Sequence, residues 1–138
     1  IDAAMRQKDQ TGMGYLVAAG MSGFFAVFFG AFGSHVLRAS LSEKAFSVFQ
    51  TANAYHFWHT LALLAVALLR IARPQKFFTS SAIALLAGLF LFSGSLYLYA
   101  IYQIPVFARL APLGGSAYML GWLFLVLGSV RAFARSSE

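Results

Sequence analysis

Residues 49–69, FQTANAYHFWHTLALLAVALL, begin with polar and aromatic side chains and then become continuously apolar up to Arg70. The stretch carries two of the three histidines of the chain, His56 and His59. An α-helix needs about twenty mostly apolar residues to cross the hydrocarbon core of a bilayer. The sequence from Lys44 to Arg70 exceeds that length, so its first turns are predicted to be tilted or to lie at the membrane interface.

The composition of the whole chain indicates an integral membrane protein. Hydrophobic residues make up 60% of the 138 residues and charged residues only 10%, against roughly 25% charged residues in a typical soluble domain. A soluble domain of this size exposes most of its residues and could not bury such an apolar excess. Because there is no cysteine, disulfides and thiolate metal sites are excluded.

Four membrane spans account for nearly the whole sequence. Residues 1–12 are predicted to be a polar N-terminal tail. Residues 13–135 are predicted to form one all-α, integral membrane four-helix bundle with up-down topology, because the connections are short. The spans are placed at about 13–34, 48–70, 80–104 and 113–131.

Local signals mark the ends of these helices. The apolar run of the first helix is broken from Gly33 onward. Ser42 followed by Glu43 predicts an N-cap and an acidic first turn for the second helix. Residues 105–111 are predicted to be a loop, with Pro112 in the first turn of the fourth helix. Three tyrosines near the end of the third span are typical of the membrane interface: Tyr97, Tyr99 and Tyr102.

The basic residues predict the orientation. With four spans, both termini lie on one side of the membrane, and that side receives seven Lys and Arg: Arg6, Lys8, Arg70, Arg73, Lys76, Arg131 and Arg135. The other side receives three: Arg38, Lys44 and Arg109. The positive-inside rule therefore predicts an N-in/C-in protein. Because these charges lie between apolar runs, we interpret them as topology signals and expect no nucleic-acid partner.

Small residues recur where helices could approach closely. Such residues, spaced four apart, let helix backbones come together in lipid. We predict helix-packing roles for two sets, one in the first span and one in the fourth: Ala19, Gly23, Ala26 and Gly30, and Gly114, Gly115, Ala117 and Gly121.

Four segments together resemble the YgdD-like family of small bacterial membrane proteins, a domain of unknown function. They are residues 30–37 (GAFGSHVL), 49–64 (FQTANAYHFWHTLALL), 92–100 (FSGSLYLYA) and 112–122 (PLGGSAYMLGW). The resemblance implies four transmembrane helices and a multi-pass protein of the bacterial inner (plasma) membrane. It implies no activity, because the family has none to carry over.

The family pattern also bears on individual residues. It places histidines at the positions of His35 and His59, and it includes Tyr55. The chain departs from the pattern at Ala52, where the family implies glycine, and at His56, where it implies a polar residue other than histidine. A role for His59 is therefore better supported than one for His56.

Polar side chains form a stripe on the second helix. Asn53, His56 and Thr60 share a face, and His59 lies about 60° away around the axis. Polar groups in lipid are costly unless they are paired, so these should face the bundle or the headgroups. One hypothesis is a ligand site near the outer membrane face, with His35 close to the other two histidines. Its candidate residues are His35, Asn53, Tyr55, His56, His59, Ser93 and Ser95. The alternative is that these groups only hydrogen-bond between helices.

The acids of the chain limit the chemistry. Its only Asp and Glu are Asp2, Asp9, Glu43 and Glu138, and none lies in mid-span. We therefore expect no metal, no cofactor and no enzymatic activity. The leading interpretation is a non-catalytic structural or accessory subunit that acts by helix–helix contacts, with the lipid bilayer, itself or a larger membrane complex as partner. The alternative is binding or transport of a small apolar or lipid-like ligand at a His/Tyr pocket.

Overall fold

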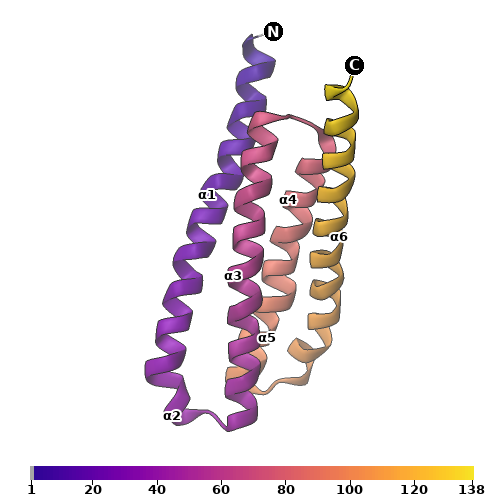
Figure 1. The fold of residues 1–138 in the computed structure, drawn as a ribbon. Helices are drawn as coiled ribbons and strands as arrows, with labels where there is room; N and C mark the ends of the chain where they lie inside the picture. Colours follow the sequence, from indigo (N-terminus) through magenta and orange to yellow (C-terminus); the bar gives the residue numbers. More distant parts are fainter. Residues whose placement is uncertain (1) are drawn as a thin grey trace.

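The computed structural model describes residues 2–138, except for the side chains of residues 8 and 9. Four helical segments lie side by side, and consecutive segments run in opposite directions (Figure 1). The first comprises α1 (Asp2–Phe32), a π-helical stretch η1 (Gly33–Leu37) and α2 (Arg38–Ser40). The second is α3 (Glu43–Ala72). The third comprises α4 (Lys76–Gly88), a second π-helical stretch η2 (Leu89–Gly94) and α5 (Ser95–Tyr102), and the fourth is α6 (Pro105–Ser136).

Each segment is long and apolar enough to cross a membrane. The predicted all-α membrane fold is therefore confirmed, while the N-in/C-in orientation stays a prediction. Both termini lie at the same end of the bundle (Figure 1). Of the predicted polar tail, Ile1 lies outside the described residues, and the backbone from Asp2 onward is the first part of α1, which projects beyond α3 (Figure 1).

Helix boundaries agree with the sequence in one place and differ in two. The Ser42 cap is confirmed, because its side chain accepts a hydrogen bond from the Ala45 N–H at 3.1 Å. The first helix does not end near residue 34, where the apolar run ends, since the chain widens into η1 and stays helical to Ser40. The predicted loop over 105–111 is also wrong.

In place of that loop, α6 begins at Pro105, and Pro112 lies inside the helix. A proline at the first helical position loses no intrahelical hydrogen bond, and residues 106–111 (VFARLA) contain nothing that opposes a helix. At Pro112 one hydrogen bond is lost, which a membrane helix tolerates when its neighbours pack around it.

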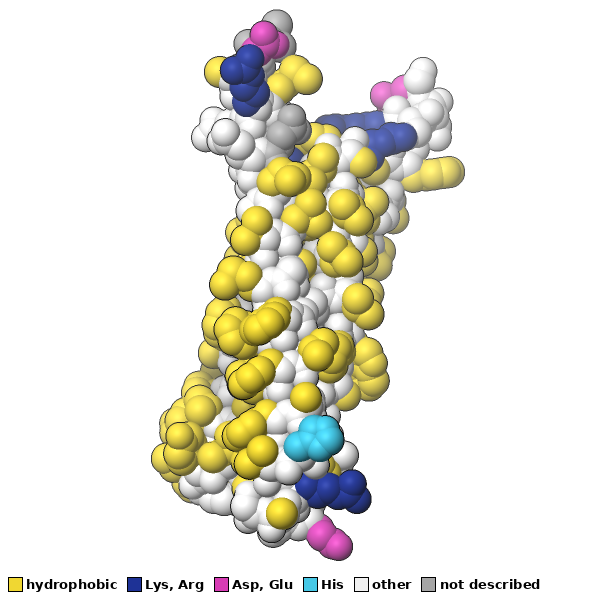
Figure 2. Space-filling model, turned by 90° about the vertical axis from the view of Figure 1, so that its left-hand side faces the viewer, with side chains coloured by type: hydrophobic (Ala, Val, Ile, Leu, Met, Phe, Trp, Pro, Cys, Tyr) yellow, Lys and Arg dark blue, Asp and Glu magenta, His cyan; other side chains and the backbone are white. Residues whose placement is uncertain are grey.

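The segments pack in sequence order. The first lies along α3, α3 along the third segment, and the third segment along α6. The buried core is centred on α3 and α4, where Leu63, Val66, Phe78 and Leu85 have almost no exposed surface. Outward faces are rich in hydrophobic side chains, and on the face in Figure 2 these follow the length of the bundle. Lipid solvates such a surface, so close packing and hydrogen bonds, rather than apolar burial alone, must hold the helices together.

The predicted small residues of the first span face α3. Ala19 and Ala26 are buried. A Cβ on Gly30 would lie 3.0 Å from the Asn53 side-chain oxygen, and one on Gly23 would lie 3.6 Å from the methyl group of Thr60. The α1–α3 contact is therefore made through residues with little or no side chain.

The small residues of α6 face the third segment. Gly114, Gly121 and Gly128 follow one another at intervals of seven residues and are buried. A Cβ on Gly114 would overlap the backbone of Leu91 and Phe92, whereas a Cβ on Gly115 would make ordinary contacts of 3.7–3.8 Å with the Phe92 ring. Ala117 is half-buried. Gly114 thus marks the closest approach of α6 to η2.

Candidate functional site

The polar part of α3 lies near the middle of the bundle. At 1.5 Å per residue, His56 is about 20 Å along the axis from Glu43 and about 24 Å from Ala72. This is deeper than the predicted site near the outer membrane face. At such depth, a polar side chain without a partner is costly. The hydrogen bonds of these residues therefore indicate what they do.

The three histidines are not brought together. His35 is exposed on η1, because the first helix continues past Gly33, and His59 lies about 24 Å up α3 from Glu43. The hypothesis that His35 joins the other two is therefore wrong. Within residues 2–138, no three His, Asp or Glu side chains of described position come close enough to hold a metal ion together.

His56 belongs to a hydrogen-bonded cluster between α1, α3 and α5, which we call the His56 network. Its Nδ1 lies 2.9 Å from the Tyr97 hydroxyl and its Nε2 lies 3.0 Å from Ser22 Oγ. Asn53 donates to Tyr97 at 3.0 Å and to the Ala26 carbonyl at 2.9 Å. Ser22 Oγ lies 2.6 Å from Thr60 Oγ1, which donates to the His56 carbonyl at 2.7 Å.

Only one arrangement of protons satisfies every member of the His56 network. Thr60 gives its only proton to the His56 carbonyl, so the proton between Ser22 and Thr60 must come from Ser22. The Tyr97 hydroxyl accepts from the Asn53 amide, and its own proton needs an acceptor, which His56 Nδ1 provides. Nε2–H of His56 then donates to Ser22, which donates to Thr60. The ring is thereby neutral and protonated on Nε2. The network connects three helices and leaves none of these hydroxyl or ring groups unpaired.

A cavity of about 510 Å³ lies over the His56 network, between α1 and the third segment; we call it the α1 groove. Its walls are apolar and include Met21, Phe25 and Phe90. His56, Ser22 and Tyr97 also line it, but their hydrogen-bonding groups are already used within the network. This groove can accommodate an apolar chain but leaves little polar chemistry for recognition.

His59 has different neighbours from His56 and belongs to a second cluster. Its ring stacks on Tyr118, with centroids 3.6 Å apart and planes inclined by 14°. Trp122 Nε1–H donates to His59 Nε2 at 3.1 Å, so Nδ1 must carry the proton that it gives to the Tyr55 carbonyl at 2.8 Å. Tyr118 in turn shares a 2.9 Å hydrogen bond with Ser93 of η2. This cluster joins α3, η2 and α6.

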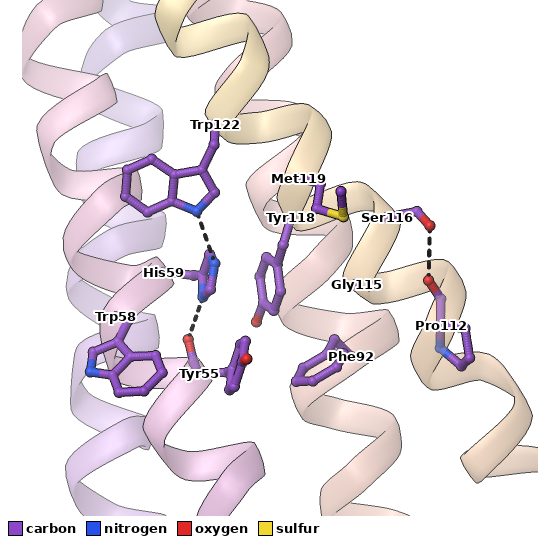
Figure 3. Close-up of a pocket in the computed structure, with 10 residues that line it drawn as sticks. All are labelled: Tyr55, Trp58, His59, Phe92, Pro112, Gly115, Ser116, Tyr118, Met119 and Trp122. Atoms are coloured by element: carbon purple, nitrogen blue, oxygen red, sulfur yellow. Dashed lines mark hydrogen bonds between the residues drawn. The ribbon is translucent and has the colours of Figure 1, made fainter.

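These side chains border a second cavity, of about 670 Å³, which we call the aromatic groove (Figure 3). It opens between α3 and α6. Both tryptophans of the chain contribute to it. Its lining residues are Tyr55, Trp58, His59, Phe92, Pro112, Gly115, Ser116, Tyr118, Met119 and Trp122.

Tyr55 is a residue of the aromatic groove whose hydroxyl group is unused. Its ring lies among those of His59, Phe92 and Tyr118, with the Phe92 centroid 4.7 Å away (Figure 3). Among the residues whose positions are described, nothing accepts or donates a hydrogen bond at its hydroxyl. The Ser116 hydroxyl, by contrast, already donates to the Pro112 carbonyl. A phenol at this depth that lacks a partner favours a molecule with an acceptor group.

The structure thus divides the predicted ligand-binding residues. Asn53 and His56 belong to the His56 network, whereas Tyr55, His59 and Ser93 border or support the aromatic groove. Ser95 is buried at the start of α5 and takes part in neither set of hydrogen bonds among the described residues. His35 stands apart.

Sequence reasoning missed four partners: Ser22, Tyr97, Tyr118 and Trp122. The predicted interfacial position of Tyr97 is wrong, because its side chain is buried against Phe29, Phe49 and His56. The available signal was that Tyr97, Tyr118 and Trp122 lie inside the segments that carry the family resemblance.

Comparison with known proteins identifies the family. A family model described as "Protein of unknown function (DUF423)" matches residues 29–115, more than half of the chain. The chain belongs to the DUF423 family. The matched part of this DUF423 protein includes His56, Tyr97, Tyr55 and His59. Ser22 and Trp122 lie outside it.

Individual relatives match this chain along most of their own length. A "UPF0382 membrane protein" of Haemophilus influenzae is 42% identical over 86% of this chain and 94% of the relative. The "UPF0382 inner membrane protein YgdD" of Escherichia coli K12 is 37% identical over 84% of this chain and 88% of the relative. The "UPF0382 membrane protein YwdK" of Bacillus subtilis is 33% identical over 85% of this chain and 96% of the relative. No solved structure matches this DUF423 chain.

These findings confirm the predicted YgdD-like family and a multi-pass inner-membrane protein. The matching family and relatives carry no statement of activity in their descriptions. What this DUF423 protein does must therefore be argued from its own side chains.

Proposed function

We propose that the protein binds a small apolar or lipid-like ligand in the aromatic groove, without catalysing a reaction on it. The observation that carries this proposal is the unused hydroxyl of Tyr55, held in an aromatic-lined cavity of about 670 Å³ halfway along the bundle. The ligand would carry one carbonyl-type acceptor for this hydroxyl and a flat or flexible apolar body for the aromatic walls.

The other residues of the groove support binding rather than reaction. His59 has both ring nitrogens occupied, one by Trp122 and one by the Tyr55 carbonyl, so it is not free to move a proton for a substrate. The acids with described side chains, Asp2, Glu43 and Glu138, belong to the first or last turns of helices or to the C-terminus. None could orient an imidazole in the middle of the bundle.

Tryptophan fluorescence offers a direct test, because both tryptophans of the chain, Trp58 and Trp122, line the groove. The probe is a short-chain ubiquinone titrated into protein in nanodiscs, since a quinone carries carbonyl acceptors and quenches indole emission. We expect saturable quenching. Tyr55→Phe should weaken the apparent affinity about tenfold, the equivalent of one hydrogen bond of roughly 1.4 kcal/mol.

Tyr102→Phe is the matched control, because it removes the same hydroxyl from an exposed tyrosine at the end of α5. It should leave the titration unchanged, and neither variant should change the melting temperature by more than a few degrees. Quenching that rises linearly with the quinone content of the bilayer, and equally in all three proteins, would mean simple partitioning and would contradict the proposal.

The second candidate is a structural or accessory subunit that acts by helix–helix contacts. The exposure of the first segment favours this candidate. In its most apolar window of 18 residues, 17% of the residues are buried, whereas 44% are buried in the corresponding window of α3. Much of α1 therefore remains open to lipid, to a second copy or to a larger membrane complex. The large side chains on this open face include Val17, Met21, Phe24 and Phe28.

Photo-cross-linking in native membranes separates this candidate from the first. A photoreactive residue at Phe24, on the open face of α1, should give one discrete product of higher mass if a partner chain lies there. The same residue at Ala26, which is buried against α3, should not. Lipid adducts alone at Phe24 would count against a subunit role.

A further inference from the structure

Arg70 is a buried cation near the end of α3, at the end of the bundle that holds both termini. Its side chain is 9% exposed. Nε donates to Thr79 Oγ1 of α4 at 2.7 Å, which fixes the guanidinium between the two helices. Nη1 is fully buried and has no hydrogen-bond partner. A guanidinium has five N–H donors, so most of its hydrogen-bonding capacity here is unused.

The part of the chain with described side chains supplies no anion for this charge. No ion pair is formed there by Asp2, Glu43 or Glu138, and Glu43 begins α3 at its opposite end. The negative end of the α3 dipole favours a cation near Arg70. However, it amounts to only about half a charge and provides no acceptor for Nη1. A buried charge without a partner is strongly unfavourable, so an anion from outside the chain would stabilise it.

The neighbouring cations are engaged elsewhere but make the same end strongly positive. Lys76 Nζ and the Arg131 guanidinium lie 5.5 Å and 5.9 Å from the Phe77 ring centroid. Arg73 Nη1 donates to Ser136 Oγ at 2.8 Å. Figure 2 shows Lys and Arg side chains gathered at this end of the bundle.

The depth of Arg70 suits a lipid headgroup. The apolar run of α3 ends at Leu69, and Arg70 lies only about 3 Å along the axis from the last helical residue, Ala72. A guanidinium binds phosphate oxygens in pairs and carries its charge at any physiological pH. We infer that Arg70, with Thr79 beside it, binds the phosphate group of an anion, either an anionic phospholipid or free phosphate. This site is separate from the aromatic groove.

Native mass spectrometry of delipidated protein in a neutral detergent tests the assignment. The protein is titrated with phosphatidylglycerol, with phosphatidylcholine and with inorganic phosphate. A lipid site predicts that one phosphatidylglycerol binds about tenfold more tightly than phosphatidylcholine, and that Arg70→Gln removes this preference. If free phosphate is the ligand, inorganic phosphate binds instead, again only when Arg70 is present.

Three further variants keep the test decisive. Arg135→Gln removes the same charge from an exposed residue of the same end and should leave the preference intact. Arg70→Lys should restore part of it. Asp9→Asn should not change it, and a tenfold gain there would mean that this carboxylate neutralises Arg70. That gain, or an undiminished preference in Arg70→Gln that still melts cooperatively in phosphatidylcholine, would overturn the assignment.

Discussion

Gly114→Ala is expected to destabilise the bundle by about 2 kcal/mol, although alanine is the better helix former. A Cβ at this position would overlap the backbone of Leu91 and Phe92. Backbone atoms cannot rotate away as a flexible side chain can, so α6 and η2 would have to separate. The separation would reduce the packing around Tyr118 and its hydrogen bond to Ser93. Unfolding of the purified protein by SDS titration in mixed micelles measures the change.

Gly115→Ala provides the matched control, one residue further along α6. Its Cβ would meet the Phe92 ring at 3.7–3.8 Å, which is ordinary contact. It should be neutral, or stabilising by up to about 1 kcal/mol through helix propensity. Equal stability of the two variants would contradict the close backbone contact between α6 and η2 at Gly114.

His56→Leu is expected to cost about 2 kcal/mol, because the buried hydroxyl of Tyr97 and the half-buried hydroxyl of Ser22 lose a partner at once. Tyr97 would lose the acceptor for its proton, and Ser22 would lose the donor to its oxygen. An interhelical hydrogen bond in lipid contributes only about 0.6 kcal/mol on average, but groups left unpaired add their desolvation cost. The same SDS titration applies, with exposed His35→Leu as the control expected to change stability by less than about 0.5 kcal/mol.

A double-mutant cycle distinguishes the network from simple loss of packing. Tyr97→Phe removes the hydroxyl that His56 accepts from. If the two residues act as one unit, the double variant should cost clearly less than the two single costs added together. Additive costs would mean that His56 stabilises the protein by filling space rather than through Tyr97.

Much of the fold could be predicted, because lipid imposes simple rules on length and charge. The Ser42 cap followed from a local pattern and is present. The predicted start of the fourth helix was wrong because Pro105 and Pro112 both suit a first turn, and no local signal in the sequence decides between them. The π-helical stretches η1 and η2 carry no proline or other strong local signal in the sequence.

The candidate site could be predicted in part. The polar stripe on α3 indicated which side chains form hydrogen bonds between helices, but it grouped His56 and His59 in one site, whereas the two rings have different partners. Which neighbours they meet is a tertiary question, since Tyr97 and Trp122 are 41 and 63 residues away along the chain. The error at His35 came from the assumption that the first helix ends near residue 34 and that the short connection brings His35 near the other histidines.

The π-helical stretch η2 also bears on how the length of the third segment can change. A π-turn holds about one residue more than an α-turn. Loss of one residue from Leu89–Gly94 would let this turn close as an ordinary α-helix, with α4 and α5 still directed at their present neighbours. The same deletion anywhere else in the segment would rotate one half by about 100° and carry Tyr97 away from His56. A one-residue deletion at η2 would therefore keep Tyr97 beside His56 while it changes which side chains of η2 are presented to α6.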